Sequence, residues 1–426
     1  MSEDNFLQPE DDTSISIVNP EETFPGLAGY VKEKFEEAEN GRYSHEQRWL
    51  QAYKNFRGVY DSTTAYRDSE RSKVFVRITK TKVLAAYGQI VDILFANKKF
   101  PLVVQHTPVP EGIAEFAHME TPLDQMQDPY GFAGDGREML PGALGAEPAK
   151  NFLGGLQSEY GQMPLAEGPA KMGEPQISPA QIAAMNMEKV IHDQLLDTNA
   201  VNVFRNAIFE SSLLGTGIVK GPFNFYKRVH QWGRNDDGER EYQPYEKVVP
   251  RIEMVSAWDF HPDPSATSID DCEYVVERHR FNRQQLRSLI KRPHFIAEAI
   301  EECLAKGPNY EDKYYEDTIR EDETEPYISE SRYEVLEYWG VLDSKLAKAA
   351  GFEEADMMSE FDELQVNIWV CGNMILRCVL NPFTPARIPY QVFPYEVNPY
   401  QLWGVGVAEN MEDAQKLMNG HVRMAI

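Results

Sequence analysis

A proline- and glycine-rich stretch limits what this 426-residue sequence can fold into. Residues 108–180 contain 10 Pro and 11 Gly in 73 positions, without a sustained apolar period. Proline lacks a backbone donor and glycine raises the entropy that folding must overcome, so such a stretch is poorly suited to a helix or a sheet core. This composition without a repeat is typical of a low-complexity loop. We therefore predict a mobile insertion at 108–180 between two folded regions.

In the region before the insertion, the apolar residues recur at the spacing of a helix. Residues 29–58 place apolar side chains among charges at helical intervals, and Asn40-Gly41 predicts a break between two amphipathic helices. A 3.6-residue apolar stripe predicts a helix over 79–95. Short strands are expected at 74–76 and 101–105.

The region after the insertion mixes helices with a hairpin. Pro179 suits the first position of a helix, and a second helix is expected over 201–214. Gly215-Thr216-Gly217 then ends the helix, and apolar runs at 218–226 and 248–255 predict a long β-hairpin. The first helix is expected to turn these residues inward: Ile182, Met185, Val190, Ile191, Leu195 and Leu196.

The last third of the sequence predicts more of both structures. Pro293 should split a helical region at 282–306. Alternation predicts strands at 333–339 and 365–379, the second turning at Gly372-Asn373. A final helix has no stop signal, so we interpret the sequence as a fragment of a longer protein. Its apolar stripe consists of Val407, Met411, Ala414, Met418, Val422 and Ala425. The predicted fold class is α+β.

The charge of the chain argues against tight nucleic-acid binding. Lys and Arg number 42 against 68 Asp and Glu, which gives a formal net charge of -26 at pH 7. Such a field repels phosphate, and residues 301–363 alone hold 20 acidic and 6 basic residues. The sign reverses at 67–82, which is typical of a solvated helix or strand face. The cations of this basic stretch are Arg67, Arg71, Lys73, Arg77, Lys80 and Lys82.

Several protein classes are disfavoured by what the sequence lacks. No run approaches 18 uninterrupted apolar residues and the first residues are acidic, so we expect neither a membrane span nor a secretion signal. No P-loop, H-E-x-x-H or G-x-S-x-G motif occurs. The four cysteines form neither a disulfide framework nor a zinc motif, which favours a reducing compartment. They are Cys272, Cys303, Cys371 and Cys378.

One segment gathers residues that bind metals in other proteins. Asp259, His261 and Asp263 lie within five residues, and Asp270 and Asp271 follow. Carboxylates and an imidazole can hold a divalent ion and activate water, as a phosphodiesterase or nuclease requires. The prolines beside them favour a turn instead. We predict the turn, with no catalytic, cofactor or metal site.

An aromatic-rich stretch lies within the acidic region. Its rings either stack on nucleobases or, given the negative charge around them, form a protein–protein surface, which we prefer. The residues are Tyr310, Tyr314, Tyr315, Tyr327, Tyr333, Tyr338 and Trp339.

Several segments match a known family in chain order. They comprise Glu46, Arg48, Trp49, Tyr53 and Arg57, then Arg71–Phe75, Leu214–Lys220, Met254–Pro264, Tyr333–Gly340, Val366–Arg377, Asn381–Phe383, Pro389-Tyr390, Pro394-Tyr395, Asn398-Pro399 and Gly404–Glu409. This series resembles the portal, or head-to-tail connector, protein of tailed bacteriophages, particularly the short-tailed phages. The resemblance covers most of the chain apart from the acidic arm and the insertion.

The resemblance implies a structural role in the virion. Portal subunits form a ring, usually of twelve, at one capsid vertex, and assemble in the host cytoplasm. Double-stranded DNA passes through the ring as a non-specific passenger while a separate terminase ATPase pumps it, and capsid and tail or adaptor proteins dock on it. The resemblance thus implies an elongated, ring-forming subunit that is not an enzyme and needs no cofactor or membrane.

The resemblance also assigns parts to the chain. Residues 1–25 would be a flexible acidic arm, 26–107 and 181–306 the wing leading to the stem, 307–400 a small, acidic, clip-like region, and 404–426 a stem helix, with a channel loop and crown expected beyond it. Acidic walls would let DNA slide, and the basic stretch would face either DNA or, as we prefer, the neighbouring subunit. The alternatives are a metal-dependent phosphodiesterase using Asp259, His261, Asp263 and Asp271, or a monomeric acidic adaptor.

Overall fold

The computed structural model describes residues 25–60, 74–95, 100–105, 179–234, 240–320, 331–349 and 362–426, together with positions 352 and 359. Two compact units divide the chain. The larger comprises Met1–Pro101 and Asp193–Ile426, and the smaller Leu102–His192. The predicted arm, except Pro25, and the predicted insertion, except its last two residues, lie outside the described residues.

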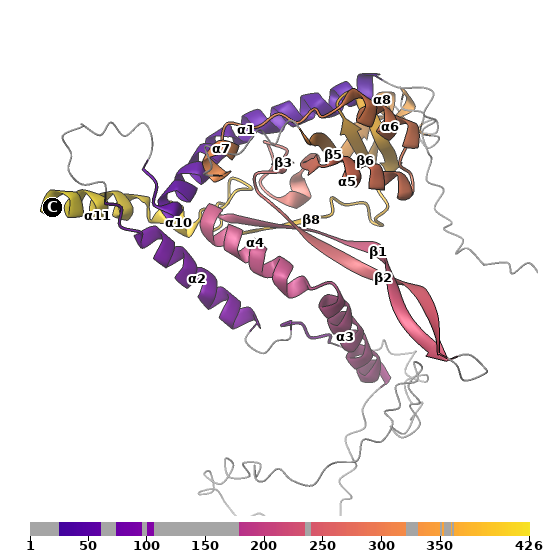
Figure 1. Cartoon of the computed structure of the whole chain (residues 1–426), viewed down its shortest axis with the longest axis horizontal. Helices are drawn as coiled ribbons and strands as arrows, with labels where there is room; N and C mark the ends of the chain where they lie inside the picture. Colours follow the sequence, from indigo (N-terminus) through magenta and orange to yellow (C-terminus); the bar gives the residue numbers. More distant parts are fainter. Residues whose placement is uncertain are drawn as a thin grey trace, which may run out of the picture. The chain divides into compact units, whose positions relative to one another are not determined.

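A five-stranded antiparallel sheet is the largest sheet of the larger unit (Figure 1). β6 and β7 form the predicted hairpin, and Gly372 at its turn has a φ of 59°, which glycine adopts without steric strain. The strands predicted at 333–339 and 365–379 are thereby confirmed. In spatial order the sheet contains β3 (Phe260–Pro262), β4 (Tyr274–Phe281), β5 (Tyr333–Asp343), β6 (Glu363–Cys371) and β7 (Met374–Leu380).

A second sheet of three strands is built around the predicted hairpin. Its order is β2 (Arg240–Val255), β1 (Thr216–Arg234) and β8 (Tyr390–Pro394), all antiparallel. β8 pairs only with Thr216–Lys220 at the start of β1. Beyond that point β1 and β2 continue together as a two-stranded ribbon, longer than the sequence predicted (Figure 1).

Helix α1 (Pro25–Arg57) packs against one face of the five-stranded sheet. Alternation decides which strand residues it meets, since successive side chains of a strand point to opposite faces. Tyr274 and Val276 of β4 join the core under α1, whereas Val275 belongs to the core on the other face. The contribution of α1 to the first core is Leu27, Ala28, Val31, Phe35 and Ala38.

The predicted break at Asn40-Gly41 is wrong, because α1 is one continuous helix of 33 residues. Gly41 serves packing instead. A Cβ atom at this position would lie 2.6 Å from the Cβ and Cγ atoms of Pro264. Only glycine therefore lets the loop after β3, which contains Pro264, approach α1 this closely.

The opposite face of the five-stranded sheet is covered in two places. The start of β1 with β8 covers part of it, and Ile218, Phe260, Val275, Trp339 and Tyr390 share that core. Two helices, α5 (Arg283–Ser288) and α6 (Ala297–Lys306), cover the rest through Leu286, Leu289 and Ile300. The predicted split at Pro293 is confirmed, since a 3₁₀ turn (Leu289–Lys291) and a loop separate α5 from α6.

Further helices lie beside the start of β1. α4 (Ala200–Leu214) ends as predicted at Gly215, whose φ is 101° and whose amide donates to the Ser211 carbonyl. A Cβ on Gly215 would lie 2.4 Å from the carbonyl oxygen of Gly404, so two backbone segments meet here. The other helices that the structure describes in the larger unit are α2 (Ile78–Phe95), α7 (Glu316–Arg320), α8 (Ser344–Ala349), α10 (Val407–Asn410) and α11 (Glu412–Ala425).

The buried face of α11 differs from the predicted apolar stripe. Gln415 and Asn419 are its buried residues, whereas Met418 is exposed. Gln415 Oε1 accepts from the Thr79 amide at 3.1 Å, and Asn419 Oδ1 accepts from the Val76 amide at 3.0 Å. These side chains satisfy the backbone before α2, which explains why 74–76 is not the strand that we predicted.

The described part of the smaller unit consists of residues 102–105 and most of α3 (Pro179–Asp197). The Val104 amide donates to Glu188 at 3.2 Å, so 101–105 is an extended segment held by a side chain and not the predicted strand. Met185 and Val190 are exposed, as is Leu196, contrary to the predicted inward face of α3. Among the described helices, none is long and apolar enough to cross a membrane.

Candidate functional site

His261, the imidazole of the predicted metal alternative, lies in the core. It is fully buried on β3, its Nδ1 atom is 3.2 Å from the Asp259 carbonyl oxygen, and its ring centroid is 4.5 Å from that of Phe35. Burial, followed by the nearby Arg42 and Arg278, holds the pKa of His261 well below its ordinary value. The residue is therefore a neutral core histidine.

The aspartates of that alternative serve separate local contacts. Asp259 lies 3.2 Å from Arg280, and Asp263 accepts from the Ser265 amide and hydroxyl at 2.8 Å each. Asp271 accepts from the hydroxyls of Thr267 and Ser268. These are the contacts of turn-forming carboxylates, and within the described residues they do not converge with His261 on one point. The turn prediction holds for the residues on either side of β3, whereas His261 itself lies within that short strand.

The aromatic-rich stretch is not the surface that we predicted. Tyr310, Tyr315, Tyr333, Tyr338 and Trp339 are all buried. Tyr314 alone among the described members is exposed, and Tyr327 lies outside the described residues. The acidic residues around them are partly internal, because they pair with cations of other strands. The rings therefore build the core beneath α1 and beside β1.

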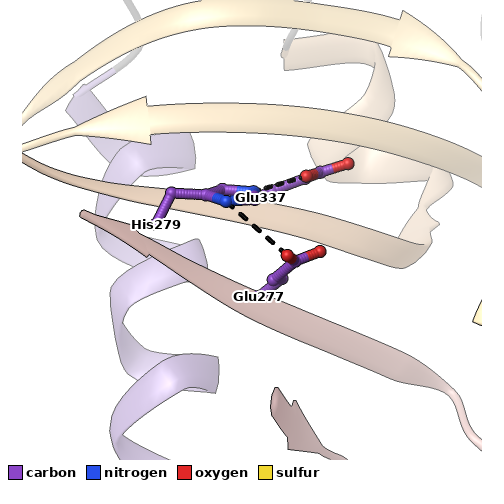
Figure 2. Close-up of side chains that lie close together, drawn as sticks. All are labelled: Glu277, His279 and Glu337. Carbon is purple, nitrogen blue, oxygen red and sulfur yellow. Dashed lines mark hydrogen bonds and ion pairs between the residues drawn. The ribbon is translucent and has the colours of Figure 1, made fainter. Parts of the chain in front are cut away.

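Ionisable side chains do converge on the opposite face of the five-stranded sheet, at Glu277, His279 and Glu337 (Figure 2). Glu277 of β4 lies directly opposite Glu337 of β5 in the register. His279 Nε2 is 2.7 Å from Glu337 Oε2, and His279 Nδ1 is 3.6 Å from Glu277 Oε1. The imidazole is nearly parallel to the rings of Phe281 and Trp369, with centroids 5.2 and 5.1 Å away.

A lysine from the other sheet completes this group. Lys220 Nζ on β1 lies 2.7 Å from Glu277 Oε2 and 2.5 Å from Glu337 Oε2. Tyr390 of β8 donates its hydroxyl to Glu277 at 2.7 Å, and Trp339 donates its indole N–H to Glu337 at 2.7 Å. We call Lys220, Glu277, His279, Glu337 and Tyr390 the sheet-junction cluster. It connects the two sheets through β1, β4, β5 and β8.

The pKa shifts agree with fully paired charges. Burial alone would raise the pKa of Glu337, but attraction to Lys220 and the hydrogen bond with His279 bring it far below its ordinary value. Burial alone would lower the pKa values of Lys220 and His279, but Glu277 and Glu337 raise both. At neutral pH the cluster therefore holds the Lys220 ammonium against the Glu337 carboxylate.

The ligand atoms of Glu277, His279 and Glu337 are close enough together to bind a metal ion, but the sheet-junction cluster is a poor fit to one. The carboxylate oxygens nearest the would-be ion already face the Lys220 ammonium, which supplies the positive charge from within the chain. A bound divalent ion would have to displace that buried ammonium against Coulomb repulsion. The cluster is thus suited to holding two sheets together.

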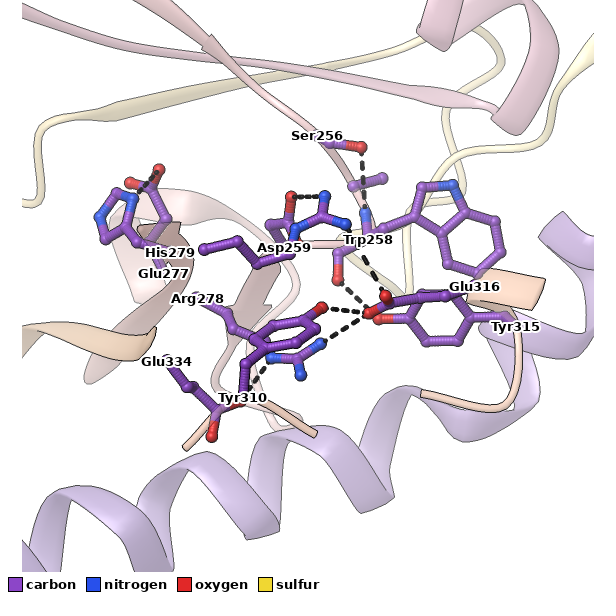
Figure 3. Close-up of polar contacts among 12 residues, drawn as sticks. Ser256, Trp258, Asp259, Glu277, Arg278, His279, Tyr310, Tyr315, Glu316 and Glu334 are labelled. Atoms are coloured by element: carbon purple, nitrogen blue, oxygen red, sulfur yellow. Dashed lines mark hydrogen bonds and ion pairs between the residues drawn. The ribbon is translucent and has the colours of Figure 1, made fainter. Parts of the chain in front are cut away.

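A second charged network lies on the α1 side of the same sheet (Figure 3). Arg278 of β4 is buried; its Nε lies 2.5 Å from Glu334 and its Nη1 3.1 Å from Glu316. Its guanidinium carbon lies 4.3 Å from the centroid of the Tyr310 ring, and Tyr310 donates its hydroxyl to Glu316. The network ties the segment before α7 to β4 and β5.

Arg42 of α1 makes the third buried charged contact. It donates to the carbonyl oxygens of Ala257 at 2.8 Å, Trp258 at 2.7 Å and Phe260 at 2.6 Å, and its Nε lies 2.8 Å from Glu46. Because these carbonyls belong to the loop after β2 and to the first residue of β3, Arg42 fixes the connection from one sheet to the other. The sheet-junction cluster, the Arg278 network and the Arg42 contacts together fix α1 and the two sheets relative to one another.

The sequence interpretation missed these residues. Their signal was present in β4, where four successive ionisable residues, Glu277, Arg278, His279 and Arg280, interrupt an otherwise apolar strand. Charges on both faces of a buried strand need partners from both sides, which is the arrangement found. Lys220 belongs to the segment Leu214–Lys220 that carries the family resemblance, but no role was predicted for it.

The basic stretch is described in part. Arg77 and Lys82 are exposed, and Lys80 Nζ lies 5.7 Å from the centroid of the Phe56 ring. Arg67, Arg71 and Lys73 lie outside the described residues. The interface or DNA-facing role of this stretch therefore stays a prediction.

Comparison with protein families gives a match that covers less than half of the chain. Residues 234–423 match the family model of the phage SU10 portal protein. No curated protein is found to match the chain. The matched residues include β2, β4, β5 and β8, which carry all of the sheet-junction cluster except Lys220. The predicted resemblance is confirmed: residues 234–423 are similar to a phage portal protein of the short-tailed phage type.

Proposed function

We propose that this chain is the subunit of a portal ring at one capsid vertex, through which double-stranded DNA is packaged and ejected. The observation that carries the proposal is the portal-family match over 234–423. Similarity to this family implies an oligomeric virion component with a structural role. The finer points of the proposal are a ring of twelve, docking of terminase, capsid and tail or adaptor proteins, and assembly in the host cytoplasm.

The buried charged contacts support a mechanical role for the subunit. A conduit wall must keep its shape while DNA moves past it, so its sheets and helices must not slide. The sheet-junction cluster ties β1 to β4 and β5, and Arg42 ties α1 to the loop between the sheets. Such contacts are directional and strongly favour one arrangement over shifted ones, because a shift would leave buried charges unpaired.

The proposal assigns parts of the ring to parts of the chain. Residues 26–107 and 181–306 belong to the wing, 307–400 to a small clip, and 404–426 to a stem helix. The mixed helix and antiparallel-sheet fold of the described residues is compatible with this assignment. Arg77 and Lys82, exposed beside α2, are proposed to pair with acidic groups of the neighbouring subunit.

The net charge supports DNA as a passenger rather than as a tightly bound ligand. Each phosphate that a protein neutralises strengthens a sequence-independent grip, which would oppose sliding. A chain of net charge -26 keeps that grip weak over most of its surface. We propose that part of the acidic 301–363 region faces the channel.

Imaging of the purified full chain tests the proposed function. Negative-stain electron microscopy is expected to show closed rings with a central hole wide enough for a DNA duplex, about 20 Å or more. Compact single particles without a hole, at every protein concentration and salt, would instead support the monomeric adaptor.

A further inference from the structure

The far end of the β1–β2 ribbon exposes aromatic side chains, although Trp232 and Tyr242 contact each other with centroids 5.6 Å apart. We call residues 225–234 of β1 and 240–249 of β2 the distal ribbon (Figure 1). Trp232 is 68% exposed, Tyr245 47% and Tyr242 44%. A two-stranded ribbon is marginal in water, and contiguous exposed apolar surface commonly marks an interaction site.

The register places these exposed rings on both faces of the ribbon. Trp232 lies opposite Tyr242, and directly opposed residues of an antiparallel pair share a face. Tyr245 lies opposite Val229, three positions from Trp232, and so belongs to the other face, as does exposed Phe225. A partner must therefore cover two faces, as a neighbouring subunit does when a ribbon inserts between its elements.

The distal ribbon is less acidic than the rest of the chain. Its two strands carry five Lys or Arg against two Asp or Glu, and the residues between them add three acidic side chains, in a chain of net charge -26. Arg228 is exposed on the distal ribbon. On the same chain, α6 exposes Glu298, Glu301 and Glu302. A heterologous ring needs two different, complementary patches on every subunit, and these two meet that requirement.

On these observations we propose that the distal ribbon docks on a second copy of this chain, with its aromatic rings covered by the neighbour and its cations facing the neighbour's carboxylates. The inference rests on the proposed ring and adds the element that joins its subunits. Duplex DNA is a weaker fit, since its bases are already stacked and cannot cover rings on two faces of a ribbon.

Paired substitutions in the full chain test the inference. Trp232→Ser with Tyr242→Ser is expected to raise the concentration needed for half-assembly at least about tenfold, because two central aromatic anchors are lost. Tyr400→Ser is the matched control, since Tyr400 is 84% exposed and lies off the ribbon, and it should change that concentration by less than about twofold. Analytical ultracentrifugation measures the assembly, and circular dichroism with thermal melting checks that each variant is folded.

A photo-crosslinking residue in place of Trp232 provides a second readout that does not depend on weakened assembly. The expected product has twice the mass of the chain. A crosslink confined to one chain, or one formed to added duplex DNA, would overturn the inference, as would unchanged assembly of the double variant. If the unaltered chain forms no ring at all, the proposed function fails; if it forms rings that the double variant forms equally well, only the role of the ribbon fails.

Discussion

Lys220 shows how one side chain connects the two sheets of the larger unit. Its ammonium is buried between Glu277 and Glu337, which face each other across β4 and β5. Breaking a buried pair costs far more than an exposed pair contributes, because the charges left behind lose both water and partner. The position of Lys220 therefore matters through the two carboxylates that it neutralises.

Replacing Lys220 by methionine is expected to destabilise the fold by about 3–5 kcal/mol, because two buried carboxylates would lose the ammonium that pairs with both. Urea unfolding followed by circular dichroism measures the change. Lys306→Met is the control, since Lys306 pairs with Glu302 on the exposed side of α6, and it should leave the unfolding midpoint nearly unchanged.

A triple variant separates charge from packing in this cluster. Adding Glu277→Gln and Glu337→Gln to Lys220→Met removes the unpaired charges, so much of the lost stability should return. If the triple variant is less stable than Lys220→Met alone, the ion pairing assigned to the cluster is wrong.

Glu210 predicts a pH dependence of stability. Its Oε1 accepts from the Ser256 hydroxyl at 2.7 Å and the Ala257 amide at 3.2 Å, and burial raises its pKa to about 7. An acid whose folded pKa lies above its unfolded value loses its stabilising effect as pH rises from about 4.5 to about 7. Glu210→Gln keeps both acceptor contacts without that charge.

The Glu210→Gln variant should therefore be more stable than the unaltered chain at pH 8, by on the order of 1–3 kcal/mol, and nearly equal to it at pH 5. Thermal melting at the two pH values measures this difference. Glu298→Gln, at an exposed glutamate of α6, is the control and should show no such pH-dependent gain. A gain for Glu210→Gln that is the same at both pH values would contradict the assigned protonation.

At the scale of elements, α1 depends on a glycine that looked like a helix break. Gly41→Ala should destabilise the fold by about 1–3 kcal/mol, because its new Cβ would lie 2.6 Å from Pro264. Gly29→Ala in the same helix meets nothing within 4 Å and should stabilise it by about 0.5–1 kcal/mol. Chemical unfolding of both variants measures the contrast. Stabilisation of equal size in both would mean that Gly41 does not pack against Pro264.

The local sequence pattern predicted a helix or strand correctly wherever neighbouring residues alone determine the structure. Pro293 split the helices around it, Gly215 ended α4, and alternation located β5 and the β6–β7 hairpin. The prediction failed where a contact with a residue far away in the sequence determines the local structure. Gly41 is helical because of Pro264, and Val76 is held by Asn419, more than 340 positions along the chain. No local spacing contains that information.

The charged site was harder to predict for the same reason. The predicted ligands His261 and Asp263 were close in sequence, yet each satisfies its own surroundings. Lys220, Glu277 and Glu337 are far apart in sequence and come together only because two sheets stack. Charges within apolar strands were a visible signal, but strand pairing was needed to join them.

At the scale of the whole molecule, the net charge of -26 overstates how acidic the surface is, because some of the acidic side chains are buried in ion pairs. Part of the acidic run is internal: Glu316, Glu334 and Glu337 pair with Arg278 or Lys220. The remainder leaves a surface that disfavours a tight grip on DNA while β1 stays basic. Opposite patches on one chain suit head-to-tail association of identical copies.

The mass of the intact assembly tests the central claim most directly. Native mass spectrometry of the full chain should give a closed multiple of the 48.7 kDa subunit, with twelve copies at about 584 kDa. On dilution the ring should stay intact and then dissociate cooperatively into single chains. A mass of 48.7 kDa at every concentration and salt would contradict the account of this chain as a portal ring subunit.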